Sequence, residues 1–175
     1  MKYHLLLFLC ALTAVSAAAQ SDPWAPLRVF EGKWEGATYG KPGKGVTTRE
    51  YKFELNHHFM SQHDTSVYQG AQSGAAPFIH EDWGMFSYDS EQKKMLWRQF
   101  HSEGFVNEYV LESVSPDGKS LVFVTTHIEN LPGVRAKKLY RVVAPDEIDE
   151  TFLLAPPGKD FGPYTEAQLK RRSDH

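Results

Sequence analysis

The sequence predicts an all-β fold: a single closed or nearly closed antiparallel up-and-down barrel of about ten strands with a short N-terminal helix. Three observations support this prediction. Segments rich in β-branched and aromatic residues recur along the 175-residue chain, as is typical of strands. Gly, Pro, Asn and Asp separate these segments at short intervals, where they favour tight turns. Apart from one short stretch near the N-terminus, helical periodicity does not extend beyond one or two turns.

The expected elements begin with a short helix at Trp24–Phe30. The ten strands expected after it are Lys33–Tyr39, Val46–Leu55, Phe59–Tyr68, Glu81–Tyr88, Met95–His101, Phe105–Val114, Ser120–Glu129, Ala136–Val143, Glu147–Leu154 and Tyr164–Arg171. Most connectors are too short for the crossover that a parallel pair needs, so neighbouring strands should be antiparallel. The longest connector, Gly70–Phe78, is rich in Ala, Gly and Ser, and we interpret it as a loop over one mouth of the barrel.

Alternation within the strands indicates one buried and one exposed face. Tyr51, Phe53 and Leu55 alternate with Lys52 and Glu54, which is the period-two pattern of a half-buried strand. Ten short strands on one chain must close or stack to hide their edges. A closed barrel of this size can hold one small ligand.

Residues 1–19 have the pattern of a secretory signal peptide. A charge at Lys2 precedes a short apolar run that ends in the small residues Ser16–Ala19, and such signals combine these three parts. The run is shorter than the ~20 apolar residues of a membrane span. A buried N-terminal helix is the alternative interpretation. We therefore expect an exported protein, periplasmic or extracellular, whose residues 20–175 form the barrel domain.

Composition excludes several classes of function. Cys10 is the only cysteine and lies in the expected signal, which excludes disulfides and a cysteine nucleophile from the mature chain. The formal net charge is −3, and long basic runs are absent from the sequence. We therefore expect no nucleic-acid partner, no acidic membrane surface and, after cleavage of the signal, no integral membrane segment.

Common catalytic and metal motifs are also missing. The Gly-rich segment Gly40–Gly45 lacks the Lys-Ser/Thr ending of a phosphate-binding loop, and no G-x-S-x-G nucleophile elbow occurs. Four histidines outside turns and termini lie on or beside different expected strands, namely His63, His80, His101 and His127. Zinc sites usually include a closely spaced ligand pair. The sequence therefore predicts no dedicated metal site.

One aromatic residue is expected to close an end of the barrel. Trp34 lies between Gly32 and Gly36 at the start of the first strand. A large indole suits a buried plug, and it can also line the inner cavity.

Read together, four segments resemble the nitrobindin-like proteins of the calycin superfamily, related in shape to lipocalins. Gly32–Gly36 is similar to their G-x-W-x-G opening, and His80–Phe86 is similar to a strand with histidine, acidic residues and glycine. His101–Gly104 matches a histidine and glycine in a hairpin, and Pro163–Arg171 matches the closing strand. The chain also resembles uncharacterised secreted bacterial domains of this type. The resemblance implies a ten-stranded barrel with a ligand cavity.

The closing strand departs from the family at one position. In haem-binding nitrobindins the histidine after the proline ligates the iron, and here Tyr164 follows Pro163. A tyrosine phenolate can ligate haem iron, provided that a nearby base or cation keeps the phenol deprotonated.

Three hypotheses of function follow. The leading one is an exported, non-enzymatic protein that binds a small, largely apolar molecule, with Trp34, Phe53, His101 and Tyr164 lining the cavity. The alternative, implied by the resemblance, is a haem b protein with Tyr164 or His101 near the iron, active in haem transport, sensing or peroxynitrite isomerisation. The last is a cofactor-free enzyme in which His101 or a buried carboxylate is the general base; no catalytic residue is assigned.

Overall fold

Short connectors and period-two segments produce strands that pair with their sequence neighbours. The computed structural model of the protein describes residues 22–69 and 76–173. Its elements are a 3-10 helix η1 (Ala25–Phe30) and the strands β1 (Gly32–Gly40), β2 (Gly43–Glu54), β3 (Phe59–Tyr68), β4 (Phe78–Asp89), β5 (Lys94–His101), β6 (Val106–Val114), β7 (Ser120–Glu129), β8 (Arg135–Ala144), β9 (Glu147–Ala155) and β10 (Gly162–Arg171).

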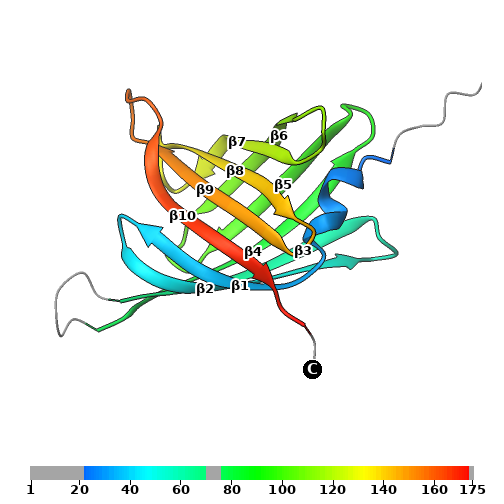
Figure 1. Ribbon diagram of the computed structural model, residues 1–175. Helices are drawn as coiled ribbons and strands as arrows, with labels where there is room; N and C mark the ends of the chain where they lie inside the picture. Colours follow the sequence, from blue (N-terminus) through cyan, green and yellow to red (C-terminus); the bar gives the residue numbers. More distant parts are fainter. Residues whose placement is uncertain (1–21, 70–75, 174–175) are drawn as a thin grey trace, which may run out of the picture.

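The ten strands form one closed antiparallel barrel in sequence order (Figure 1). Each strand pairs with the next, and β10 returns to pair with β1, where Trp34 lies opposite Arg171. Among the described strands, closure leaves no unpaired edge. The predicted fold class, including the short N-terminal helix, is confirmed.

Some boundaries differ from those expected, each for a local reason. The first hairpin is tighter, because Gly40 and Gly43 pair directly and both have positive φ angles, so the strands continue to the turn. Strand β4 begins at Phe78 rather than Glu81, because it pairs with the end of β3 at Tyr68. Residues 70–75 of the expected loop lie outside the described residues, as does the expected signal segment 1–19.

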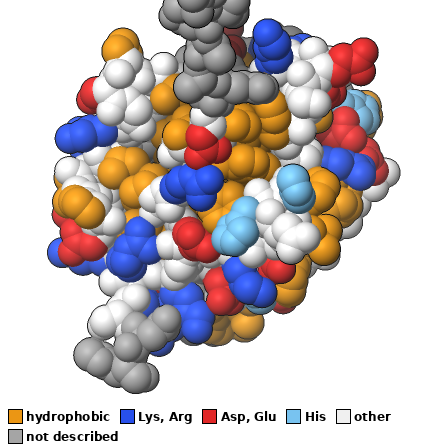
Figure 2. Space-filling view, turned by 90° about the vertical axis from the view of Figure 1, so that its right-hand side faces the viewer, with side chains coloured by type: hydrophobic (Ala, Val, Ile, Leu, Met, Phe, Trp, Pro, Cys, Tyr) orange, Lys and Arg blue, Asp and Glu red, His pale blue; other side chains and the backbone are white. Residues whose placement is uncertain are grey.

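One end of the barrel is filled by η1 and its neighbours. Leu27 and Phe30 of η1 are buried, and the ring of Phe30 lies 5.0 Å from that of Tyr140. Trp34 is fully buried there, and its indole Nε1 donates to the Phe30 carbonyl over 2.7 Å. Figure 2 views the molecule from the side of η1 and shows hydrophobic side chains gathered near the centre, with charged and histidine side chains among and around them. This end is closed by packed aromatic and aliphatic groups.

The alternation predicted for β2 holds up to its last residues. Tyr51 and Phe53 are buried, Glu50 and Lys52 are exposed, and Glu54 is half-buried. Leu55 instead lies just beyond the strand, with a positive φ angle and a side chain 71% exposed. The turn to β3 reverses the chain at this point, which takes Leu55 out of the alternating pattern.

None of the described helices is long and apolar enough to span a membrane.

Candidate functional site

The barrel contains a cavity of about 380 Å³ at the end away from η1. The last residues of β3 and β5 bound it, together with the first residues of β4 and β6, the strands that follow them. Apolar side chains form much of the wall, among them Phe78, Phe105, Ile128, Val134, Phe152 and Leu154. Polar and charged side chains lie further along the same inward faces. The cavity thus has an apolar wall and a polar side.

Four charged residues from two pairs of neighbouring strands, β2–β3 and β8–β9, form a buried network on the polar side. Arg49 on β2 forms ion pairs with Asp64 on β3 and with Glu150 on β9, the latter over 3.0 Å. Lys138 on β8 lies 3.4 Å from the same Glu150 carboxylate. Each of these positions is an inward one in its strand, which places the four side chains together inside the barrel.

The surroundings shift the pKa values of the acidic groups in this network in opposite directions. Burial acts to raise the pKa of Glu150, but the charges of Arg49 and Lys138 outweigh it and lower that pKa. Burial has the larger effect on Asp64, whose pKa rises to about 7 despite the nearby guanidinium. Burial would lower the pKa of Arg49, but the two carboxylates raise it well above its usual value. Arg49 and Glu150 are therefore charged at neutral pH.

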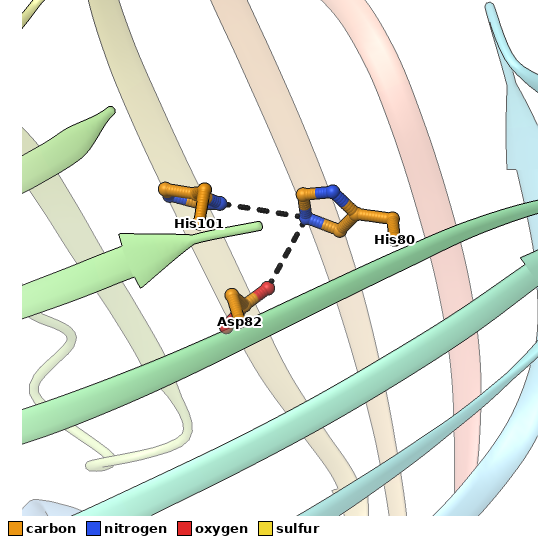
Figure 3. Close-up of side chains that lie close together, drawn as sticks. All are labelled: His80, Asp82 and His101. Atoms are coloured by element: carbon orange, nitrogen blue, oxygen red, sulfur yellow. Dashed lines mark hydrogen bonds and ion pairs between the residues drawn. The ribbon is translucent and has the colours of Figure 1, made fainter. Parts of the chain in front are cut away.

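A second cluster consists of His80, Asp82 and His101 on the cavity wall (Figure 3). His80 and Asp82 are two residues apart on β4 and therefore share one face of the sheet. The β4–β5 register places Asp82 directly opposite His101. His80 Nε2 lies 3.3 Å from Asp82 Oδ2 and 3.4 Å from His101 Nδ1.

Each member of this cluster has a further partner. Glu103 Oε1 lies 2.7 Å from His80 Nδ1, and the Asn107 side-chain amide lies 3.0 Å from His101 Nε2. The amides of Gln99 and Gln62 donate to Asp82 Oδ1. These contacts fix the orientation of both imidazoles and of the carboxylate.

The environment separates the pKa values of the three groups. Burial lowers the pKa of His101 to about 4, so its imidazole is neutral at pH 7. Burial acts to raise the pKa of Asp82, but the hydrogen bond from His80 and the charge of Lys138 hold it at about 2. Burial acts to lower the pKa of His80, but hydrogen bonds with Asp82 and Glu103 outweigh it and raise the pKa.

The four residues expected to line a cavity fall into two pairs. His101 and Tyr164 line the 380 Å³ cavity. Trp34 belongs to the closed end, and Phe53 packs against Trp24 with ring centroids 5.4 Å apart. Neither is among the lining residues, because η1 fills the barrel where these inward positions lie. Contact of His101 or Tyr164 with a ligand stays a prediction.

Sequence reasoning did not assign the charged residues that line the cavity. Arg49 continues the inward series of Tyr51 and Phe53 by one step of two residues, and a charge within such a series is a readable signal of a polar interior. The charges of Lys138 and Glu150 are likewise at inward positions of β8 and β9. Their convergence depends on strand register, which the sequence does not specify.

Neither Tyr164 nor His101 is placed to serve as an axial ligand of haem iron. Tyr164 packs edge-on against Phe152, 5.7 Å between centroids, and no hydrogen bond or ion pair to its hydroxyl is found among the described residues. His101 directs its two ring nitrogens toward His80 and Asn107, so neither nitrogen faces open space in which a porphyrin could lie.

Fold and site together define a closed ten-stranded antiparallel barrel with an internal cavity of small-molecule size. Rv2717c from M. tuberculosis is similar, with a TM-score of 0.68 and 18% identity over 86% of this chain and 98% of that one. The S-type phycobiliprotein lyase CPES from Guillardia theta is similar with a TM-score of 0.54 and 10% identity, over 84% of this chain and 90% of that one. At these identities the likeness concerns the fold alone. Family models and curated proteins give no match to the sequence.

Proposed function

We propose that this protein is an exported carrier of a small, largely apolar molecule whose polar end bears hydrogen-bond donors. The observation that carries the proposal is the 380 Å³ cavity with an apolar wall and a polar side. Ligand pockets of such barrels combine an apolar lining with a few polar groups that fix the orientation of the ligand. The closed end supplies the rigid support, because η1 and Trp34 fill it.

Unpartnered acceptors indicate the chemistry of the polar end. Glu150 Oε2 and Gln99 Oε1 are buried and have no hydrogen-bond partner among the described residues, and both residues line the cavity. Gln99 donates its amide nitrogen to Asp82, which directs its oxygen away from that carboxylate. A buried acceptor left unpaired costs about 1–3 kcal/mol. A hydroxyl or amino group on the ligand would satisfy these oxygens.

Binding is tested with 1-aminoanthracene, a fluorescent apolar probe with one amino donor, and with anthracene as the probe without the donor. We expect saturable binding of the amine and weaker binding of the hydrocarbon, since one hydrogen bond contributes about 0.5–1.5 kcal/mol. Mass spectrometry of small molecules that co-purify with the folded protein then identifies the natural ligand class.

Two neighbouring residues of β9 provide a matched pair of variants. Leu154 lines the cavity, whereas Leu153 lies one residue away on the other face of the strand. Leu154→Glu should abolish saturable binding because it places a charge in the apolar wall. Leu153→Glu should leave binding intact. Equal effects of the two substitutions, or no saturable binding by the wild type, would refute the carrier.

The export part of the proposal rests on the signal-like residues 1–19. Intact-mass measurement of the protein from its native host should give a chain that starts near Ala18–Ser21. A mature, correctly located protein that retains Met1 would rule out cleavage.

A further inference from the structure

Three donor atoms of the cavity wall converge on one point. His80 Nε2, Asp82 Oδ2 and His101 Nδ1 face one another across β4 and β5 (Figure 3), and the ligand atoms of this cluster all lie within 4.8 Å of one another. Two edges of this triangle of atoms, those from His80 Nε2, measure 3.3 and 3.4 Å. A tetrahedral zinc ion with ligand bonds of about 2.0–2.1 Å separates its ligands by about 3.4 Å. An ion could therefore sit between these atoms with little movement of the side chains.

Glu103, the hydrogen-bond partner of His80, leaves the Nε2 atom of that ring available to a metal. Glu103 Oε1 lies 2.7 Å from Nδ1, so Nδ1–H donates to the carboxylate and Nε2 faces the other two ligands. A carboxylate behind a histidine is the usual support of a metal-bound imidazole, because it fixes the tautomer and increases ligand basicity. Binding of the ion would displace the proton that His80 Nε2 shares with Asp82.

Asn107, the partner of His101, can likewise leave one ring nitrogen, Nδ1, available to a metal. The Asn107 amide lies 3.0 Å from Nε2 and 3.0 Å from the Tyr109 hydroxyl. An amide can present either its nitrogen or its oxygen at such a position. With the oxygen turned toward the ring, Asn107 accepts from both Nε2–H and the Tyr109 hydroxyl, which leaves the lone pair of His101 on Nδ1.

Charge and access also suit a divalent ion. The negative charges of Asp82 and Glu103 balance the two positive charges of the ion, and the cations nearby are paired: Lys138 with Glu150, and Arg49 with Asp64 and Glu150. His80, Asp82 and His101 all line the cavity, so a fourth coordination position would open into it. Two imidazoles and one carboxylate favour zinc and other first-row transition ions over calcium and magnesium, which prefer oxygen ligands.

We propose that His80, Asp82 and His101 form a binding site for a divalent transition-metal ion, represented by Zn²⁺, with one coordination position open to the cavity. The proposal goes beyond the carrier function and does not depend on it. An organic ligand with a donor atom could complete the coordination of the ion.

The test uses the purified full chain after removal of metals with a chelator. Calorimetric titration should show one Zn²⁺ bound per chain in the wild type. Co²⁺ in the same site should give the intense visible absorption of a four-coordinate ion. His101→Ala and Asp82→Asn should each remove both signals. Glu103→Gln, which keeps all three ligands, should weaken Zn²⁺ binding on the order of ten-fold.

Two controls separate this site from adventitious binding. His63 forms a comparable histidine–carboxylate contact with Glu81 on the outer surface, 2.9 Å between Nε2 and Oε1, and His63→Ala should leave Zn²⁺ affinity unchanged. The double variant His57→Ala/His58→Ala removes the adjacent histidines of the β2–β3 turn and should also bind normally. Circular dichroism shows whether each variant is folded. If Asp82→Asn does not fold, Glu103→Gln still tests the site, because Glu103 lies at a partly exposed position.

Three results would overturn the proposal. One is the absence of stoichiometric Zn²⁺ binding by the wild type. Another is undiminished affinity in folded His101→Ala and Glu103→Gln. The third is loss of binding in either control, which would place the ion at the surface.

Discussion

The role of an inward side chain in this barrel depends on how far along its strand it lies. Tyr51 and Arg49 are two residues apart on the same face of β2. Tyr51 packs 5.5 Å from Phe30 at the closed end, whereas Arg49 pairs with Asp64 and Glu150 beside the cavity. Strand β2 therefore contributes to stability at one end and to the site at the other.

Trp34 is the residue on which the closed end depends most directly. Trp34→Ala should cost about 3–5 kcal/mol of unfolding free energy, as truncation of a buried large aromatic does, because the indole is fully buried and hydrogen-bonded to the Phe30 carbonyl. Trp83→Ala is the control, since that indole is 56% exposed on the outer face. Urea unfolding followed by circular dichroism measures both. A Trp34→Ala variant as stable as Trp83→Ala would show that the indole does not support the barrel.

Tyr164 distinguishes the carrier from a haem protein. Because its ring packs against Phe152 and no described group forms a hydrogen bond or ion pair with its hydroxyl, Tyr164→Phe should leave the absorption spectrum of any hemin complex unchanged. Tyr164→His, which places an imidazole at this position, is the comparison variant and is titrated with hemin alongside. A wild type that purifies with stoichiometric haem, lost on Tyr164→Phe, would reverse this assignment.

At the scale of elements, the seam between β1 and β10 closes the barrel. Gly36 of β1 lies opposite Leu169 of β10. A Cβ atom at position 36 would lie 1.7 Å from the backbone oxygen of Gln168. The second glycine of the G-x-W-x-G segment is therefore required by the close approach of the neighbouring backbone, which the sequence does not reveal.

Gly36→Ala should destabilise the protein by about 1–3 kcal/mol or more, as other overpacked sites do, because the seam must open to admit the methyl group. Gly162→Ala is the matched control: it lies at the other end of β10, where an added Cβ would meet no atom within 4 Å. Thermal unfolding should show a lower midpoint for Gly36→Ala and an unchanged or higher one for Gly162→Ala. Equal midpoints for the two variants would mean that the seam adapts without cost.

At the scale of the whole molecule, the fold is far more predictable than the site. Strand, turn and antiparallel pairing follow from local composition and short connectors, so the barrel could be derived from segments such as β2 and β3. The His80–Asp82–His101 cluster depends on the register that sets Asp82 opposite His101, and a shift of one residue would turn the side chains to the other face. Which end of the barrel is closed depends on where η1 packs. That is a tertiary contact, which local sequence patterns do not specify.

The two ends of the barrel should therefore differ in how much a core substitution costs. Leu27 of η1 is 2% exposed among packed aromatics, whereas Leu154 borders the cavity. Leu27→Ala should cost about 2–5 kcal/mol, because truncation leaves a void in a filled core. Leu154→Ala should cost clearly less, because its side chain already faces open space and has fewer contacts to lose. Urea unfolding of the two variants, with unchanged m-values as the check on comparable states, measures the difference. Equal costs would mean that the cavity end is packed as tightly as the closed end, and the cavity would then not be available to a ligand.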